Sequence, residues 1–382
     1  MTSKERILRT IRHQEPDKVP IAPRMTNFIQ RKFGSSDWTC YKRIKKYYDF
    51  DPFKEVSPNI NNYFRNLGPD YLDLPDVTVE IRVGKDGNAR EIERVFHTPE
   101  GDLKDVTFVP QAGGTYGIFV DPIKKEYMVK DENDLNKLKY IFPDPFKCDL
   151  TGIRHISDAF GEDGLTGVYI YSALGYRGCE GRGMEDLMVD YYEDREFLKD
   201  YLSILHGQVM KETKACLEAG AEVILAGNFS EGISAGWSPE HFKDLFLPLF
   251  KAQSDLAHEY GAVYMHFDDG KMMANLDNFL EEGCDVLQTC GPPPMGDVDL
   301  KYAKEKAGGK ICLMGHIDLL NVIMKGTPEE IDSTVRETIK IAGPGGGFII
   351  GSNDSLRDET PDRNVELYFE ACNRYRDYPI NL

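Results

Sequence analysis

A histidine and an aspartate stand two residues apart in the second half of this chain. His266 and Asp268 close the apolar run 262–265, and Gly270 follows shortly after them. If that run is a β-strand, its period of two places both side chains on one face. An imidazole beside a carboxylate can share a divalent metal ion or pass a proton. The same spacing also fits a buried structural pair, so the neighbouring elements must decide between the two interpretations.

Polar side chains recur after the other apolar runs. The candidates are Tyr169, Tyr171, Ser172, Asn228, Glu231, Trp237, Asp269, Gln288, Cys290, His316, Asp318, Ser352, Asn353 and Asp354. In parallel barrels the chemistry lies at the carboxyl ends of the strands, so this pattern predicts one active site built from several loops. Taken singly, each has a structural alternative: Cys290 fits a small core residue, for example.

Six short apolar runs alternate with helix-patterned segments and must position these side chains. The runs are 167–172, 223–227, 262–267, 286–290, 311–315 and 348–351, and the helical segments are 190–219, 239–260, 272–282, 300–307 and 327–342. Such alternation predicts a parallel sheet. Further strands at 19–23 and near 70–74 bring the count to about eight. We therefore expect an α/β fold, a (β/α)8 TIM barrel that spans residues 1–382 as one domain.

A different pattern occupies residues 76–130. Segments 78–83 and 89–96 alternate polar and apolar residues, and the glycine-containing segment 84–88 joins them. This predicts a β-hairpin with one solvated face, followed by a strand at 103–109. We interpret 76–130 as an N-terminal β-hairpin or sheet insertion into the barrel.

Composition excludes several classes of partner. The chain has 382 residues and a formal net charge of −18, which disfavours binding to nucleic acid or to an anionic membrane surface. No apolar stretch is long enough to cross a bilayer, and the opening residues are polar. The eight cysteines include no CxxC pair. Because the polar opening residues do not form a signal peptide, we expect reduced thiols and a cytoplasmic location.

With these motifs in view, the chain resembles the uroporphyrinogen decarboxylase superfamily. Besides the His266 strand, the segments that carry the resemblance are Ser3-Lys4-Glu5-Arg6-Ile7, Pro16-Asp17-Lys18-Val19-Pro20, Trp237-Ser238-Pro239-Glu240, Gly315-His316-Ile317-Asp318, Gly326-Thr327-Pro328-Glu329-Glu330 and 345–352. The resemblance implies a (β/α)8 barrel, in agreement with the strand pattern. It covers most of the chain outside the β insertion.

The superfamily holds two main chemistries. Its uroporphyrinogen decarboxylases carry Arg-Gln-Ala-Gly-Arg after the first strand, where this chain has 24–28 reading Arg-Met-Thr-Asn-Phe. Its zinc-dependent, corrinoid-linked methyltransferases carry His-x-Cys at the fifth strand and a second Cys at the eighth. This chain matches the histidine with His266 but has Asp268 and Ser352 in place of the cysteines. The resemblance therefore favours the methyltransferase branch with an altered metal site.

The altered ligands suggest a harder metal centre that suits an ether oxygen as leaving group. We expect zinc on His266, Asp268 and Glu231, with Cys290 as a fourth ligand and His316 as a further catalytic residue. The substrate-binding residues expected from the strand ends are Tyr171, Asn228, Phe229, Trp237 and Asn353.

This interpretation describes the first methyltransferase of an O-demethylase system. Such a protein moves a methyl group from a methoxylated aromatic donor to a corrinoid protein. The usual corrinoid signature, Asp-x-His-x-x-Gly, is absent from this chain. Cobalamin must then come on a separate corrinoid protein, and a homodimer is left open.

Two rival interpretations stay open. In a metal-free decarboxylase, Arg24, Arg177 or Arg182 would hold carboxylates, and His266 or His316 would supply a proton. In a binding module the barrel would only bind a corrinoid protein or another ligand. A binding module does not need so many titratable groups at its strand ends, which favours an enzyme.

Overall fold

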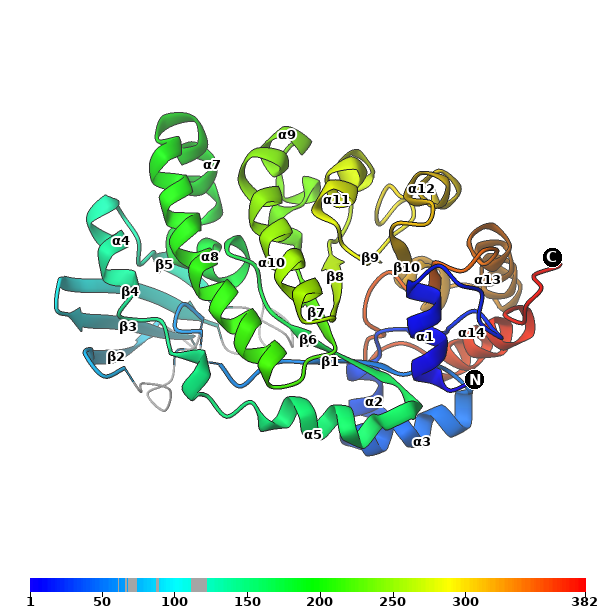
Figure 1. Ribbon diagram of the computed structural model, residues 1–382. Coiled ribbons are helices and arrows are strands. Elements are labelled where there is room, and N and C mark those ends of the chain that lie inside the picture. The colour runs from blue at the N-terminus through cyan, green and yellow to red at the C-terminus, as the bar shows by residue number, and fades with distance from the viewer. Residues whose placement is uncertain (61, 66, 68–73, 87–88, 111–121) are drawn as a thin grey trace. The chain divides into compact units, whose positions relative to one another are not determined.

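The computed structural model describes residues 1–60, 62–65, 67, 74–86, 89–110 and 122–382 (Figure 1). The chain forms two compact units. The first contains residues 1–58, 150–170 and 213–382, and the second contains residues 59–149 and 171–212. The first unit holds the parallel strands and most of the residues that the sequence singled out.

A seven-stranded parallel sheet forms the centre of the first unit. Its order is β1(Phe53–Val56), β6(Leu165–Tyr169), β7(Val223–Ala226), β8(Val263–Phe267), β9(Val286–Thr289), β10(Cys312–Ile317) and β11(Phe348–Ser352). Every neighbouring pair is parallel. The six strands from β6 onward lie where the apolar runs predicted them, in chain order across the sheet.

The expected strand at 19–23 pairs with the last strand of the sheet. Ala22 N donates to Ile350 O at 2.9 Å, and Ile350 N donates to Pro20 O at 2.9 Å. On its other side this segment meets the residues before β1, because Asp51 N donates to Ile21 O at 2.8 Å. The result is a mixed α/β fold with a curled parallel sheet, compatible with a TIM-barrel-like fold.

One strand differs from the expectation. The strand anticipated near 70–74 falls mainly on residues outside the described part of the chain. The sequence did not predict β1, which pairs with β6 from Phe53↔Leu165 to Val56↔Val168. Its two central residues, Lys54 and Glu55, are charged, so no apolar run marks it.

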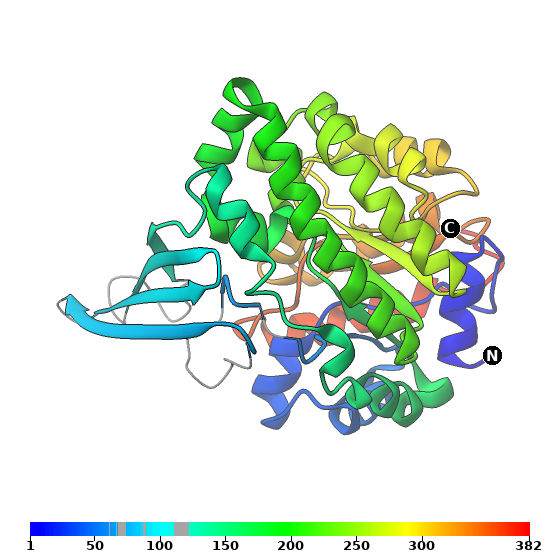
Figure 2. The ribbon, with the colours of Figure 1, turned by 60° about the vertical axis from the view of Figure 1, so that its left-hand side comes forward.

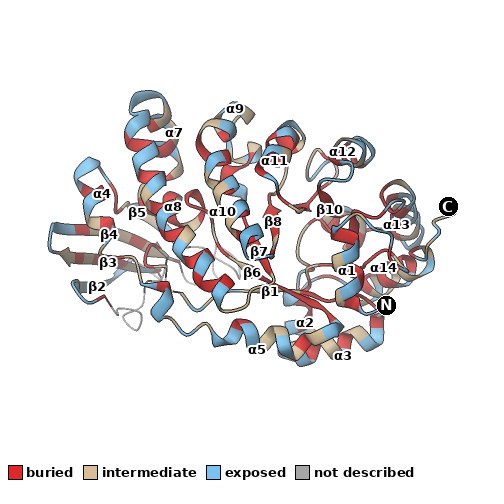
Figure 3. Cartoon of the chain, viewed as in Figure 1, coloured by how far each residue is buried: buried red, intermediate tan, exposed pale blue. Residues whose placement is uncertain are grey.

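Helices cover the outer side of the parallel sheet, and Figure 3 shows their buried residues turned toward the strands. In the first unit they are α1(Ser3–Ile11), α2(Thr26–Phe33), α3(Trp38–Tyr48), α5(Thr151–Phe160), α9(Pro239–His241), α10(Leu247–Glu259), α11(Leu276–Glu282), α12(Leu300–Ala307), α13(Pro328–Ala342) and α14(Asp362–Tyr375). Ser238 and Thr327 form capping boxes at the starts of α9 and α13, as their sequence context indicates. Thr2 caps the start of α1 by accepting from Glu5 N. No helix in the described part of the chain is long and apolar enough to span a membrane.

The interior of the sheet is apolar and closed at one end by α1. Ile7 and Ile11 of this helix join the core cluster that also contains Phe53, Leu165, Val223, Leu225, Met265, Phe267, Val286, Cys312, Met314 and Ile349. Gly347, just before β11, donates to Thr10 O of the helix, so α1 lies at the amino ends of the strands. The opposite, carboxyl ends remain as the place for chemistry.

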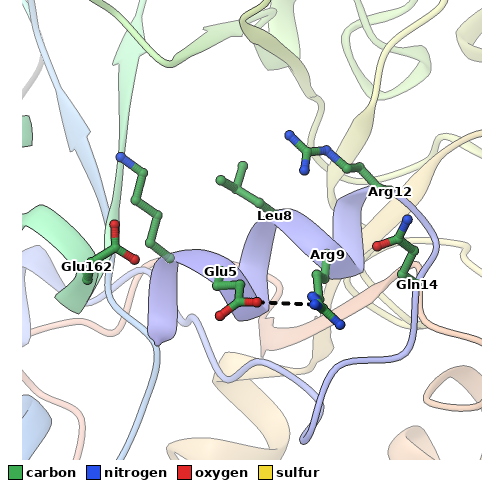
Figure 4. Close-up of a pocket in the computed structure, with 7 residues that line it drawn as sticks. Glu5, Leu8, Arg9, Arg12, Gln14 and Glu162 are labelled. Atoms are coloured by element: carbon green, nitrogen blue, oxygen red, sulfur yellow. Dashed lines mark ion pairs between the residues drawn. The ribbon is translucent and has the colours of Figure 1, made fainter. Parts of the chain in front are cut away.

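A surface hollow of about 380 Å³ lies beside α1 (Figure 4). Its lining is Lys4, Glu5, Leu8, Arg9, Arg12, Gln14 and Glu162. The charges there are partly paired, since Arg9 lies 3.3 Å from Glu5 and Lys4 contacts Glu222. This hollow is at the end of the sheet away from the predicted site residues.

The second unit contains an antiparallel sheet and several helices. Its strands, in order, are β2(Thr78–Asp86), β3(Ala89–Thr98), β4(Gly101–Val109) and β5(Ile123–Glu126), which lie side by side in Figure 2. The segments expected as a hairpin pair from Thr78↔His97 to Asp86↔Ala89. The helices are α4(Glu132–Leu138), α6(Cys179–Arg182), α7(Met184–Glu193) and the start of α8(Arg195–Glu218). The helix expected at 190–219 is thus divided at Asp194.

Candidate active site

Strand β8 turns its two faces to different surroundings. Met265 and Phe267 belong to the core cluster inside the sheet. Because side chains alternate along a strand, His266 points the other way, toward the covering helices. Its exposure is 1%. The histidine on which the sequence hypothesis depended therefore faces α10 and α11 and not the interior of the sheet.

Aromatic rings and one carboxylate enclose the His266 imidazole. Its Nδ1 lies 2.9 Å from Oε1 of Glu282, which is itself fully buried. The rings around it are Phe250 at 4.8 Å, Phe279 at 4.7 Å and Phe242 at 6.1 Å between centroids. These contacts are those of a packed core histidine held by a carboxylate.

Asp268 is buried as well, but it does not contact His266 in any described hydrogen bond. Its Oδ1 accepts from the backbone N of Asp269 at 2.8 Å, and its Oδ2 has no partner among the described residues. Burial, reinforced by the charges of Asp269, Glu231 and Asp297, raises the pKa of Asp268 well above its ordinary value. Burial thus disfavours the ionised carboxylate, which is the form that binds a metal ion.

Cys290, another of the proposed ligands, is also held by the protein. Its Sγ donates to Leu287 O at 3.3 Å, and burial raises the pKa of the thiol to about 12. The thiol therefore stays protonated at neutral pH, whereas zinc binds the thiolate. Within the described ranges, no three histidine, cysteine, aspartate or glutamate side chains are arranged to hold a metal ion. The expected zinc ligands do not fit a zinc site in this arrangement.

His316 lies at the end of β10, where the backbone has a positive φ of 106°. Its Nδ1 lies 2.8 Å from the carbonyl O of Cys290, which can only accept, so Nδ1 carries the proton. Burial lowers the pKa of His316, so the ring is neutral. Its Nε2 then carries a lone pair that can accept a hydrogen bond or a proton. This histidine keeps a nitrogen for chemistry.

The five expected substrate-binding residues have different surroundings. Trp237 is buried and donates to Ser230 O at 2.9 Å, and Asn353 accepts from Leu319 N at 2.9 Å. Both make structural contacts. Asn228 is buried after β7, whereas Phe229 is 49% exposed. Tyr171 belongs to the second unit, where its carbonyl accepts from Arg177.

An arginine and a glutamate meet at the carboxyl ends of the strands. Arg24 Nε lies 2.7 Å from Glu55 Oε1, and Nη2 donates to Oε2 at 3.0 Å. This ion pair, with one hydrogen bond, joins the segment after residue 23 to β1. The guanidinium lies 4.8 Å from the centre of the Phe267 ring, inside the sheet. Tyr169 meets the same ring edge-on at 6.2 Å, so an aromatic surface borders the ion pair.

Asp269 faces this ion pair from the end of β8. Its Oδ1 accepts from the hydroxyl of Thr289 at 3.2 Å. Burial, with the nearby charge of Asp354, raises the pKa of Asp269 to about 6, against the opposing effect of Arg24. A carboxylic acid with such a pKa can hold or release a proton near neutrality. We refer to Arg24, Glu55, Tyr169, Asp269 and Thr289 as the mouth cluster.

Comparison with known proteins places the chain in a family. The family described as uroporphyrinogen decarboxylase (URO-D) matches residues 166–375, more than half of the chain. The chain belongs to the uroporphyrinogen decarboxylase family. It is 23% identical over 265 residues to the uroporphyrinogen decarboxylase of Trichodesmium erythraeum, a match over 67% of this chain and 70% of that protein. A Legionella pneumophila protein of the same description is 24% identical, over 51% of this chain and 53% of that protein.

A solved structure supports the fold. The structure described as a methyltransferase from Methanosarcina mazei superposes with a TM-score of 0.64 over 98% of this chain and 99% of that one. The sequences are 14% identical, so this likeness concerns the fold. Membership of the URO-D family indicates an enzyme.

The sequence signals for the mouth cluster were weaker than those for His266. Asp269 was among the strand-end candidates, and Arg24 entered only through the decarboxylase alternative. Glu55 was missed because β1 was missed. The spacing of Phe53 and Glu55, two apart before the apolar Val56, is the signal that could have found it.

Proposed function

We propose that this URO-D family protein is a methyltransferase that moves a methyl group from a small methoxylated aromatic compound to a corrinoid carried by a separate protein. The observation that supports it is the position of Asp269. Its carboxyl, with a pKa of about 6, is influenced by the charge of Arg24, whose guanidinium lies over the Phe267 ring that Tyr169 meets edge-on. The aryl oxygen of an ether is a better leaving group when an acid gives it a proton. Aromatic side chains offer a surface on which an aromatic donor can pack.

The proposed reaction is an acid-assisted cleavage of a carbon–oxygen bond. The reduced corrinoid supplies the electron pair that accepts the methyl group. Asp269 gives its proton to the ether oxygen, which keeps the bonding electrons and leaves as a phenol. Thr289 donates to Asp269 Oδ1 and holds the carboxyl in place. No step in this scheme passes through zinc, because the expected ligands do not fit it.

Other residues of the site bind and orient the donor. The Arg24–Glu55 pair presents a nearly neutral polar edge, while Phe267 and Tyr169 present ring surfaces. His316, fixed by Cys290 O, offers Nε2 as an acceptor. We propose that His316 orients the donor or receives the phenolic proton after transfer.

Decarboxylation of a small carboxylic acid is the second candidate. It is favoured by the Arg24 guanidinium at the mouth, which can hold a carboxylate, and by the curated decarboxylase relatives. Asp269 would then protonate the carbon that loses carbon dioxide. Both chemistries use the same acid, so the leaving group distinguishes them.

The test is to incubate the protein with cob(I)alamin, first with methoxylated and then with carboxylated aromatic compounds. Methyl transfer is followed by the change in corrinoid absorbance, and carbon dioxide release is measured in parallel. We expect transfer from a methoxylated compound and its loss in Asp269→Asn, with Asp277→Asn, an exposed carboxylate on α11, unaffected. Carbon dioxide release without corrinoid would replace the first proposal by the second.

A further inference from the structure

A glutamine is buried inside the parallel sheet, directly below the mouth cluster. Gln288 of β9 pairs in register with Phe267 of β8 and with Met314 of β10. Both neighbours, and Val286 two residues earlier on the same strand, belong to the core cluster. Period two therefore points Gln288 into the sheet, and its exposure is 1%.

The side-chain amide of Gln288 has a buried acceptor atom that receives no hydrogen bond. Its Oε1 has no hydrogen-bond partner among the described residues. Buried polar side-chain atoms are nearly always paired, so an unpaired one in a native protein needs an explanation, and a bound group is one such explanation. The apolar neighbours Phe267 and Met314 offer no donor.

The position of Gln288 places this acceptor next to the proposed reaction site. Thr289, the next residue, donates to Asp269, and the Arg24 guanidinium lies over Phe267, which pairs with Gln288. An aromatic ring that packs on Phe267 beside Asp269 would reach the level of the glutamine. The acceptor thus lies on the inner face of the sheet, level with Phe267 and one residue before Thr289.

Resting on the proposed function, we infer that Gln288 is a specificity-determining residue that accepts a hydrogen bond from a hydroxyl group on the aromatic substrate. The substrate class is then a methoxyphenol, with a free hydroxyl as well as the methoxy group. A carboxylate has no donor at neutral pH, and a cationic donor would lose its hydration among apolar side chains. A neutral hydroxyl satisfies the amide oxygen without either cost.

The experiment compares matched pairs of compounds by calorimetric binding to the whole protein. Each pair is a methoxyphenol, with ortho, meta or para hydroxyl, and the corresponding dimethoxybenzene, which lacks the donor. For wild-type protein we expect at least one methoxyphenol to bind about 10- to 100-fold more tightly than its partner. Equal affinity within all three pairs overturns the inference.

Variants assign the preference to the glutamine. Gln288→Met has similar size without the amide, so it should bind both members of the preferred pair with equal affinity. Gln14→Met, at the opposite end of the sheet beside α1, should keep the wild-type preference. A preference retained in Gln288→Met overturns the inference and leaves an ordered water as the partner of the amide. If that variant does not fold, Gln288→Leu and the wild-type comparison carry the same decision.

The outcomes separate this inference from the proposed function. Methyl transfer without a hydroxyl preference overturns the role of Gln288 and keeps the methyltransferase. Failure of wild-type protein to bind any of the six compounds overturns both.

Discussion

The two faces of β8 carry similar residues in opposite environments. On the outer face His266 is sealed between phenylalanine rings and Glu282. On the inner side Phe267 is followed two residues later by Asp269. The Asp269 carboxylate accepts from Thr289 and is influenced by the charge of Arg24, which pairs with Glu55. The outer face holds a polar pair packed among core side chains. The inner side ends in a polar group beyond an apolar interior. The type of residue therefore matters less here than the face it occupies.

Two adjacent aspartates show the difference most directly. Burial raises the pKa of Asp268 well above its ordinary value. Partial exposure and the opposing Arg24 charge hold the pKa of Asp269 at about 6. A shift of one residue along the chain thus separates a structural acid from one suited to catalysis.

The largest expected effect is on activity, from Asp269→Asn. The amide keeps the shape of the side chain but cannot give a proton to the leaving oxygen. We expect kcat to fall about 10²- to 10⁴-fold, with an unchanged unfolding midpoint in urea. Activity within twofold of wild type, in a folded variant, would contradict the assignment of the inner face as the reactive one. Asp277→Asn serves as the surface control.

The second effect is on stability, from His266→Ala. The substitution removes a packed ring and leaves the buried Glu282 carboxyl without its partner. We expect the free energy of unfolding to fall by about 2–4 kcal/mol. The matched control is His258→Ala, since His258 lies 2.9 Å from Asp285 but is 40% exposed. For His258→Ala the free energy of unfolding should fall by less than about 1 kcal/mol. If His266→Ala instead abolished activity at full stability, the outer face would be the site.

The fold could be predicted because its signals are local. Six of the seven strands of the parallel sheet are apolar runs between helix-patterned segments, and capping boxes at Ser238 and Thr327 mark two helix starts. The exception was β1, whose inner face carries Glu55. Charged residues placed in this short strand removed the apolar pattern that would have revealed it.

The site could be predicted only as a region. Alternation along the apolar run predicts His266 and Asp268 on one face, but the sequence does not state which face is inside. That depends on Met265 and Phe267 meeting the neighbouring strands, which is a property of the assembled sheet. The Arg24–Glu55 pair joins residues 31 apart and leaves no local spacing to read.

A third effect is on binding, from Glu55→Gln. The carboxylate of Glu55 compensates the Arg24 charge at the mouth. Without it, we expect a methoxylated benzoate to bind about tenfold more tightly, while a neutral methoxybenzene binds as before. Calorimetric titration measures both affinities, with Glu366→Gln as a control that breaks a surface pair with Arg363. Weaker benzoate binding would mean that Glu55 orients Arg24 for a carboxylate, which favours the decarboxylase.

A fourth effect concerns pH. The pKa of Asp269 in the folded protein is raised to about 6, so the acid form is present below that pH and is lost above it. If Asp269 acts as the general acid, kcat falls as pH rises through about 6, by roughly tenfold per unit beyond it. The residual activity of Asp269→Asn should lack this step. A rate that rises through the same pH range would make the carboxylate a base. The free energy of unfolding follows the same direction. The stabilising contribution of protonated Asp269 is fully present below the ordinary pKa of 3.8 and is lost as pH rises through about 6.

The smallest effect is expected from metal removal. The Cys290 thiol is protonated and donates to Leu287 O, and His266 Nδ1 is held by Glu282. A zinc ion at these residues would have to displace both contacts and deprotonate a thiol whose pKa is about 12. We therefore expect dialysis against a chelator to leave the thermal midpoint unchanged and the zinc content of purified protein below stoichiometry. Stoichiometric zinc that disappears in both His266→Ala and Cys290→Ser would contradict this prediction. It would show that the outer face of β8 rearranges to bind a metal ion, so the two faces would differ in whether they hold a metal.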